Sequence, residues 1–72
     1  MKVKLLNDGG YGDVLFQNIK FPVVVEGFYY DGMRHCVGVT CDELVRIGVR
    51  KADLAGEQDL AFKVFKDCEV IK

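Results

Sequence analysis

The sequence predicts a mainly β fold: a small five-stranded barrel with one short helix, in a single domain spanning residues 1–72. Two observations support this prediction. The first is a dense run of β-branched and aromatic residues, Ile19–Tyr30, which suits a pleated and half-buried surface. The Asp31-Gly32 pair that follows accepts the positive φ angles of a tight hairpin turn. The second is size, because 72 residues, 50% of them hydrophobic, leave room for one small core.

Five segments are expected to be strands, because they are rich in β-formers or alternate apolar and polar residues. They are Lys2–Leu6, Ile19–Tyr30, Met33–Thr40, Leu60–Phe65 and Cys68–Ile71. A two-residue turn at Asp31-Gly32 would place Phe28 opposite His35 and Tyr29 opposite Arg34. Between the first two strands, residues 7–13 form a glycine-rich loop, and the apolar patch Val14–Phe16 is compatible with either a short strand or a loop.

Residues 41–48 are predicted to form the one helix, between the third and fourth strands. Thr40 and Glu43 have the spacing of a capping box, in which the hydroxyl accepts the Glu43 amide and the carboxylate reaches back. Gly48 is a suitable residue to end the helix. A helix of about two turns is too short to be stable alone, so it must pack against the sheet.

The residues expected to fill the core are the apolar ones on one face of each predicted element. They are Val3, Leu5, Phe21, Val23, Val25, Val37, Val39, Leu44, Ile47, Phe62, Val64 and Val70.

Charge argues against several classes of partner. Ten Lys and Arg residues stand against 11 Asp and Glu residues, so the formal net charge is −1. A nucleic-acid groove normally requires a clustered basic face, so this balance disfavours one. The first apolar residues are too few for a signal peptide, and no run reaches the length of a membrane span. An odd count of three cysteines fits free thiols, and we expect a protein of the cytoplasm with no membrane partner.

Three possible chemical sites are weighed and disfavoured. The loop Asp8–Asp13 has glycines that suit a phosphate, but it lacks the Lys-Ser/Thr ending of a P-loop, and its aspartates repel anions. Zinc-ligand residue types are present without the paired short spacings of structural zinc sites: His35, Cys36, Cys41 and Cys68. Adjacent residues on a strand point to opposite faces, so His35 cannot activate Cys36. We therefore expect no enzyme, no catalytic residue, no metal and no cofactor.

The aromatic residues give the leading functional hypothesis. Five Phe and three Tyr exceed what so small a core encloses, and protein contact surfaces are rich in tyrosine. The candidate partner-binding residues are Tyr11, Phe28, Tyr29, Tyr30 and Arg34. They predict a non-enzymatic protein-interaction module, with self-association included because a small core gains from oligomerisation. The alternative is single-stranded nucleic-acid binding, in which aromatic rings stack on bases.

Two resemblances extend this interpretation. The order of the predicted elements is similar to that of SH3-like barrels and of the OB-fold, where the helix also falls between the third and fourth strands. The segments Lys2–Tyr11, Phe21–Gly27, Glu43–Gly48 and Cys68–Ile71 resemble segments of small uncharacterised bacteriophage and prophage proteins. This second resemblance implies a phage-encoded accessory protein that acts on a host protein in a bacterial cytoplasm. It transfers no catalytic or binding residue.

Overall fold

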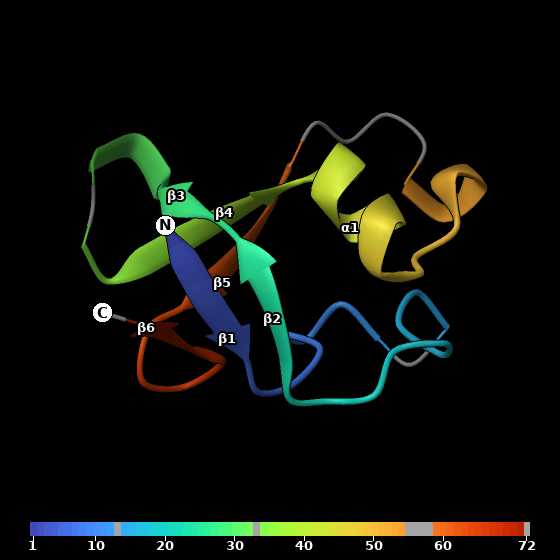
Figure 1. Ribbon diagram of the computed structural model, residues 1–72, viewed down its shortest axis with the longest axis horizontal. Coiled ribbons are helices and arrows are strands. Elements are labelled where there is room, and N and C mark those ends of the chain that lie inside the picture. Colours follow the sequence, from blue (N-terminus) through green and yellow to red (C-terminus); the bar gives the residue numbers. More distant parts are fainter. Residues whose placement is uncertain (13, 33, 55–58, 72) are drawn as a thin grey trace.

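A computed structural model describes residues 1–12, 14–32, 34–54 and 59–71. The predicted loop end at Asp13 and the predicted strand start at Met33 lie outside these residues. The described elements, drawn in Figure 1, are β1 (Lys2–Leu5), β2 (Val23–Glu26), β3 (Phe28–Tyr29), η1 (Tyr30–Gly32), β4 (Cys36–Thr40), α1 (Cys41–Ile47), η2 (Lys51–Leu54), β5 (Asp59–Lys63) and β6 (Cys68–Ile71). The patch Val14–Phe16, left open between strand and loop, contains no strand at its described residues.

The strands form two three-stranded antiparallel sheets, in the orders β2-β1-β6 and β3-β4-β5. The five-stranded barrel is therefore wrong, because neither sheet closes and the described residues contain no ladder that joins the two. The likeness to SH3-like and OB-like barrels is wrong for the same reason. A closed barrel would have to pair the outer edges of β2 and β5 with other strands. Side chains already bond to the backbone at those edges, Tyr11 at β5 and Glu43 at β2.

The sixth strand arises because the run from Ile19 to Tyr30 is divided at Gly27. There the chain leaves β2 in one sheet and enters β3 in the other. A Cβ at this position would lie 2.9 Å from a methyl of Val3, 3.0 Å from a methyl of Val37 and 3.1 Å from the carbonyl oxygen of Gly38. Only glycine lets the two sheets approach this closely.

The hairpin register also differs from the prediction. Phe28 pairs with Gly38 rather than His35, and Tyr29 pairs with Val37 rather than Arg34. The two-residue turn is replaced by η1, and β4 begins only at Cys36, so the connection is longer. The register moves by three positions, and an odd shift exchanges the two faces of a strand. As a result Tyr29 shares the inner face with Val37.

The helix prediction is confirmed. The Thr40 hydroxyl accepts the Glu43 N–H at 3.2 Å, and Gly48 ends the helix with a φ of 123°. The carboxylate of Glu43 differs from the capping box in its partner, because it accepts the backbone N–H of Glu26 in β2. The side chain at the third helical position therefore ties the helix to the first sheet.

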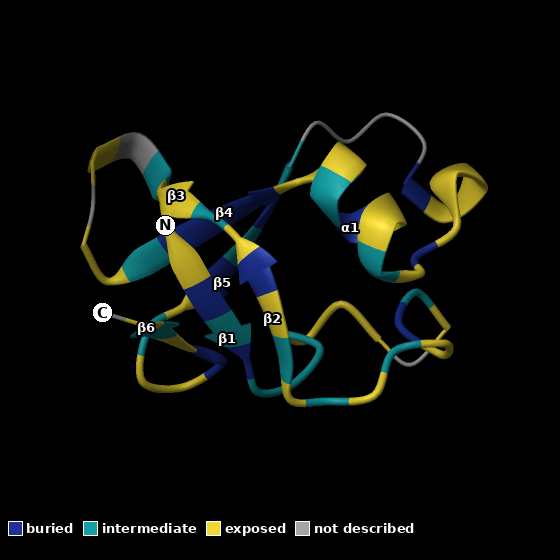
Figure 2. Ribbon diagram, viewed as in Figure 1, coloured by how far each residue is buried: buried dark blue, intermediate teal, exposed yellow. Residues whose placement is uncertain are grey.

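The core lies between the two sheets and beneath α1, and Figure 2 shows the buried stretches of β1, β2 and β4. The predicted core residues that are fully buried are Val3, Leu5, Val25, Val37, Val39, Leu44 and Phe62. Those that are half-buried and pack against them are Phe21, Val23, Ile47, Val64 and Val70. The buried hydrophobic residues outside the predicted set are Phe16, Val49, Leu54, Leu60 and Cys68.

We predict that Thr40→Ala lowers the free energy of unfolding by about 1 kcal/mol, because the Glu43 amide loses its acceptor. Thr40→Ser keeps the oxygen and serves as the control, with a smaller loss expected. Chemical denaturation followed by circular dichroism measures both variants. Equal stability of Thr40→Ala and the wild type would contradict a role for the cap.

Candidate functional site

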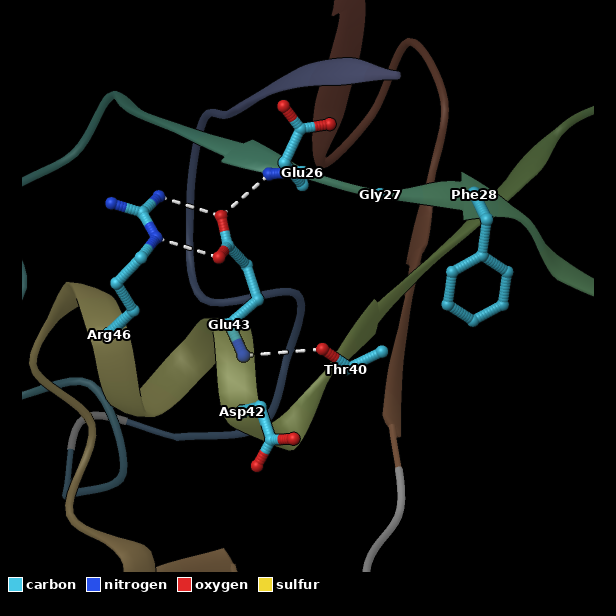
Figure 3. A pocket seen from close by; sticks show the side chains of 7 residues that line it. All are labelled: Glu26, Gly27, Phe28, Thr40, Asp42, Glu43 and Arg46. Carbon is cyan, nitrogen blue, oxygen red and sulfur yellow. Dashed lines mark hydrogen bonds and ion pairs between the residues drawn. The ribbon is translucent and has the colours of Figure 1, made fainter.

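Two hollows of about 420 Å³ each lie on the surface of the described residues. The first lies between α1 and the crossing from β2 to β3. Figure 3 shows its lining residues: Glu26, Gly27, Phe28, Thr40, Asp42, Glu43 and Arg46. The second, which we call the groove, lies where β3, the turn after β5 and β6 come together. The groove is lined by Tyr29, Arg34, Val64, Phe65, Glu69 and Val70.

The Glu43 carboxylate bonds to two of the other polar groups of the first hollow, the Arg46 guanidinium and the Glu26 N–H. Arg46 Nε donates to Glu43 Oε1 at 2.7 Å, and a second guanidinium nitrogen donates to Glu43 Oε2 at 2.6 Å. The N–H of Glu26 donates to the same Oε2 at 2.7 Å. The hydrogen bonds from Arg46 lower the pKa of Glu43 to about 2, against the opposing effect of burial. The Glu43 carboxylate is used to hold α1 to β2, so its role in the hollow is structural.

The groove is the end of the space between the two sheets. Tyr29 and Val64 come from the inner side of the β3-β4-β5 sheet, since Tyr29 pairs with buried Val37 and Val64 continues the alternation of buried Phe62. Val70 comes from the inner side of the other sheet, where its partner is buried Val3. Val64 and Val70 are only half-buried, because the core does not extend far enough to cover them. The groove is therefore apolar at its base.

Phe65 projects at the rim of the groove. It is 94% exposed and has a φ of 73°, a left-handed conformation that costs an ordinary residue about 1 to 2 kcal/mol. The turn is held by buried Asp67, whose N–H donates to the Lys63 carbonyl at 2.8 Å and whose Oδ2 accepts the Lys63 N–H at 3.3 Å. An aromatic ring is thus held in water on a strained backbone, without a packing role that would account for it.

The groove also carries one charge of each sign. Arg34 and Glu69 line it, and neither forms an ion pair with another residue of the described part of the chain. The charged side chains that do pair are elsewhere: Lys2 with Glu26, Arg46 with Glu43, and Arg50 with Asp53. The two groove charges are available to an external partner.

The structure distributes the predicted partner-binding residues over three places. Tyr29 and Arg34 meet in the groove. Phe28 and Tyr30 lie on the opposite face of the second sheet, where their rings stack at 6.3 Å over Gly38. Phe28 also lines the first hollow, so the aromatic run serves both faces of its strand, as expected from a pleated chain.

Tyr11 lies in the third place, at the edge of β5. Its hydroxyl donates to the Ala61 carbonyl at 3.0 Å and accepts the Ala61 N–H at 2.9 Å. Its ring packs at 5.7 Å from that of Phe62. One side chain therefore satisfies both backbone groups of an edge residue, and Tyr11 is separate from the groove.

The disfavoured sites have the following geometry. In the glycine-rich loop, Gly9 N–H donates to Asn7 Oδ1 at 2.7 Å and Gly10 N–H donates to Asp8 Oδ1 at 2.9 Å, so neither amide faces a ligand. The described residues contain no cluster of three metal-ligating side chains. All three cysteines are free, and burial raises the pKa of the Cys68 thiol to about 11, which keeps it protonated.

Sequence reasoning misses Phe65, Val64, Glu69 and Val70 as groove residues. The alternation of Leu60, Phe62 and Val64 places Phe65 on the outer side of its strand, which is the only signal in the sequence. Its left-handed backbone has no sequence marker, since glycine or asparagine normally indicates such a turn. Val64 and Val70 are predicted to be core residues, and their partial exposure depends on where the sheets end.

Comparison with known proteins gives no relative. A scan against protein-family models, a search of curated proteins and a search of solved structures each found no match. Within the described residues, no helix has both the length and the apolar character that crossing a membrane requires.

We predict that the wild type has a higher free energy of unfolding than Glu43→Gln, and that this difference depends on pH. The pKa of Glu43 is lowered from 4.5 to about 2 in the folded state. Its charge therefore stabilises the fold above the unfolded value, and the contribution is lost as the pH falls through the folded pKa. The difference in free energy of unfolding should be about 1 to 2 kcal/mol at neutral pH. Urea titrations should show that it vanishes as the pH approaches the folded pKa of Glu43.

The control for this experiment is Asp42→Asn, which removes a neighbouring exposed carboxylate from the same helix. Asp42 has no hydrogen-bond or ion-pair partner among the described residues, so this variant should retain the acid-dependent loss of the wild type. An advantage over Glu43→Gln that is constant with pH would exclude the carboxylate as its source.

Proposed function

We propose that this chain is a non-enzymatic protein-binding domain whose partner docks in the groove. The observation that supports the proposal most strongly is Phe65, a nearly fully exposed aromatic ring on a left-handed backbone. Both properties oppose stability, and residues in such conformations cluster where a ligand or partner is bound. The groove beside it adds Tyr29 and Arg34, residue types that dominate the binding energy of protein interfaces.

The charges of the groove favour a polypeptide over a nucleic acid. A single-stranded nucleic acid needs a row of cations beside stacking rings. The groove instead combines one arginine with one glutamate around apolar residues. The resemblance to phage and prophage segments makes a host protein the first partner to look for.

The test is quantitative capture from a lysate of cells that naturally express the chain, with wild-type and variant full-length chains as bait. Phe65→Asn should reduce capture of the partner about tenfold or more, because it removes an aromatic anchor. The same variant should be as stable as the wild type, or up to about 1 kcal/mol more stable, since asparagine tolerates positive φ. Thermal unfolding measures the second effect.

Two matched variants distinguish the groove from other surfaces. Val14→Asn removes another apolar side chain, 71% exposed and not among the residues that line the groove, and should leave capture unchanged. Tyr29→Ser should weaken capture, whereas Tyr30→Ser, on the opposite sheet face, should weaken it less. Undiminished capture by both Phe65→Asn and Tyr29→Ser would overturn the proposal.

A further inference from the structure

The direction of the backbone groups at the sheet edges follows from the hydrogen bonds. In an antiparallel ladder, successive residues of a strand bond alternately to opposite sides. The N–H of Leu6 donates to the Asp67 carbonyl in continuation of the β1–β6 register, so Glu69 and Ile71 bond toward β1, whereas Cys68 and Val70 face outward.

The outward groups of Ala61 and Lys63 on the β5 edge are already occupied. The Val64 N–H donates to the His35 carbonyl, so Ala61 and Lys63 face away from β4. The Tyr11 hydroxyl bonds both backbone groups of Ala61. Asp67 bonds both backbone groups of Lys63. A further strand cannot add to β5 without displacing these side chains.

The β2 edge is occupied in part, and β3 is very short. Gly27 and Met1 exchange backbone hydrogen bonds, so Val24 and Glu26 face away from β1, and the N–H of Glu26 donates to Glu43. Helix α1 packs against this strand. Strand β3 has 2 residues, half the length of β6, and so presents the shorter edge.

The edge of β6 is different. The Cys68 carbonyl accepts the Phe65 N–H, but no described residue outside β1 bonds to the backbone of Val70. Val70 also lines the groove. An outward-facing N–H and C=O pair therefore lies directly beside Phe65, Tyr29 and the two unpaired charges. Such an edge is a template for strand addition.

We propose that the occupant of the groove is a second copy of this chain, with β6 of the two copies paired antiparallel about a two-fold axis at Val70. The inference rests on the proposed function, because it names the partner of the same surface. The two Val70 residues would exchange backbone hydrogen bonds and join the two β2-β1-β6 sheets. Glu69 would lie opposite Ile71 of the second copy, so this register brings no like charges together.

The charges of the groove favour a second copy of this chain over a partner whose charges are all positive or all negative. A two-fold axis places each surface against itself, so a contact from Arg34 to Glu69 of the second copy occurs twice. The groove carries these two opposite charges unpaired and is otherwise apolar or aromatic, which makes it complementary to itself. A chain of 72 residues also gains stability from association that its small core does not supply.

The test is sedimentation equilibrium of the full chain over a wide range of concentrations. The wild type should rise from the 8.1 kDa mass of one chain toward twice that mass. Glu69→Arg and Arg34→Glu should each weaken association about tenfold, since each opposes like charges across the axis. The double variant carrying both changes should restore it. Lys20→Glu, an exposed charge reversal not among the groove-lining residues, should have no effect.

Val70→Pro tests the strand pairing separately, because it removes an N–H that β1 does not use. Proline is tolerated on an edge strand, so circular dichroism should show that the variant is folded. Sedimentation equilibrium should show that it remains monomeric. A wild type that is monomeric at every concentration, or a dimer unaffected by the groove variants, would overturn the inference. If the dimer inference were overturned but Phe65→Asn abolished capture of a different protein, the proposed function would stand with that protein as the partner.

Discussion

The close approach of the two sheets at Gly27 is the constraint on which the rest of the structure depends. Three groups from both sheets lie about 3 Å from the position of a missing Cβ there. This contact sets the angle at which the chain leaves β2 and enters β3, and so determines which side chains of the aromatic run face the core. Tyr29 reaches the groove, and Phe28 reaches the opposite sheet face, as a consequence.

The hydrogen bonds of the sheet edges explain both the open architecture and the location of the candidate site. Side chains, rather than further strands, bond to the outward backbone groups of Ala61 and Lys63 in β5 and to the N–H of Glu26 in β2. The bonds from Tyr11 and Glu43 tie a loop and the helix to edges that are 50 and 17 positions away in the sequence. The outward backbone groups of Val70 in β6 have no such partner among the described residues and lie beside the apolar groove, which concentrates the potential for binding at one end of the molecule.

Local signals in the sequence predict local structure well. Thr40, Glu43 and Gly48 define the helix, and period-two alternation identifies most of the core, because these patterns depend on neighbouring residues only. The barrel and the hairpin register are wrong because they depend on distant contacts. Whether the connection after Tyr30 has two residues or more is decided by packing of η1, and closure is decided by Tyr11, whose partner lies 50 positions away.

The candidate site is predictable in part for the same reason. Tyr29 and Arg34 are identifiable from residue type, since tyrosine and arginine are enriched at interfaces. Phe65 is not, because its significance comes from a backbone angle and an exposure that only the folded chain reveals. Similarly, the partial exposure of Val70 depends on where the facing sheet ends.

Phe65 bears on how this chain would respond to artificial evolution for heat resistance alone. A screen that rewards a higher melting temperature without rewarding partner capture would favour glycine or asparagine at this position, because either relieves the left-handed backbone. The selected variants would have a higher melting temperature and would lose the aromatic anchor through the same substitution. Thermal robustness and recognition are therefore opposed at one residue of this chain.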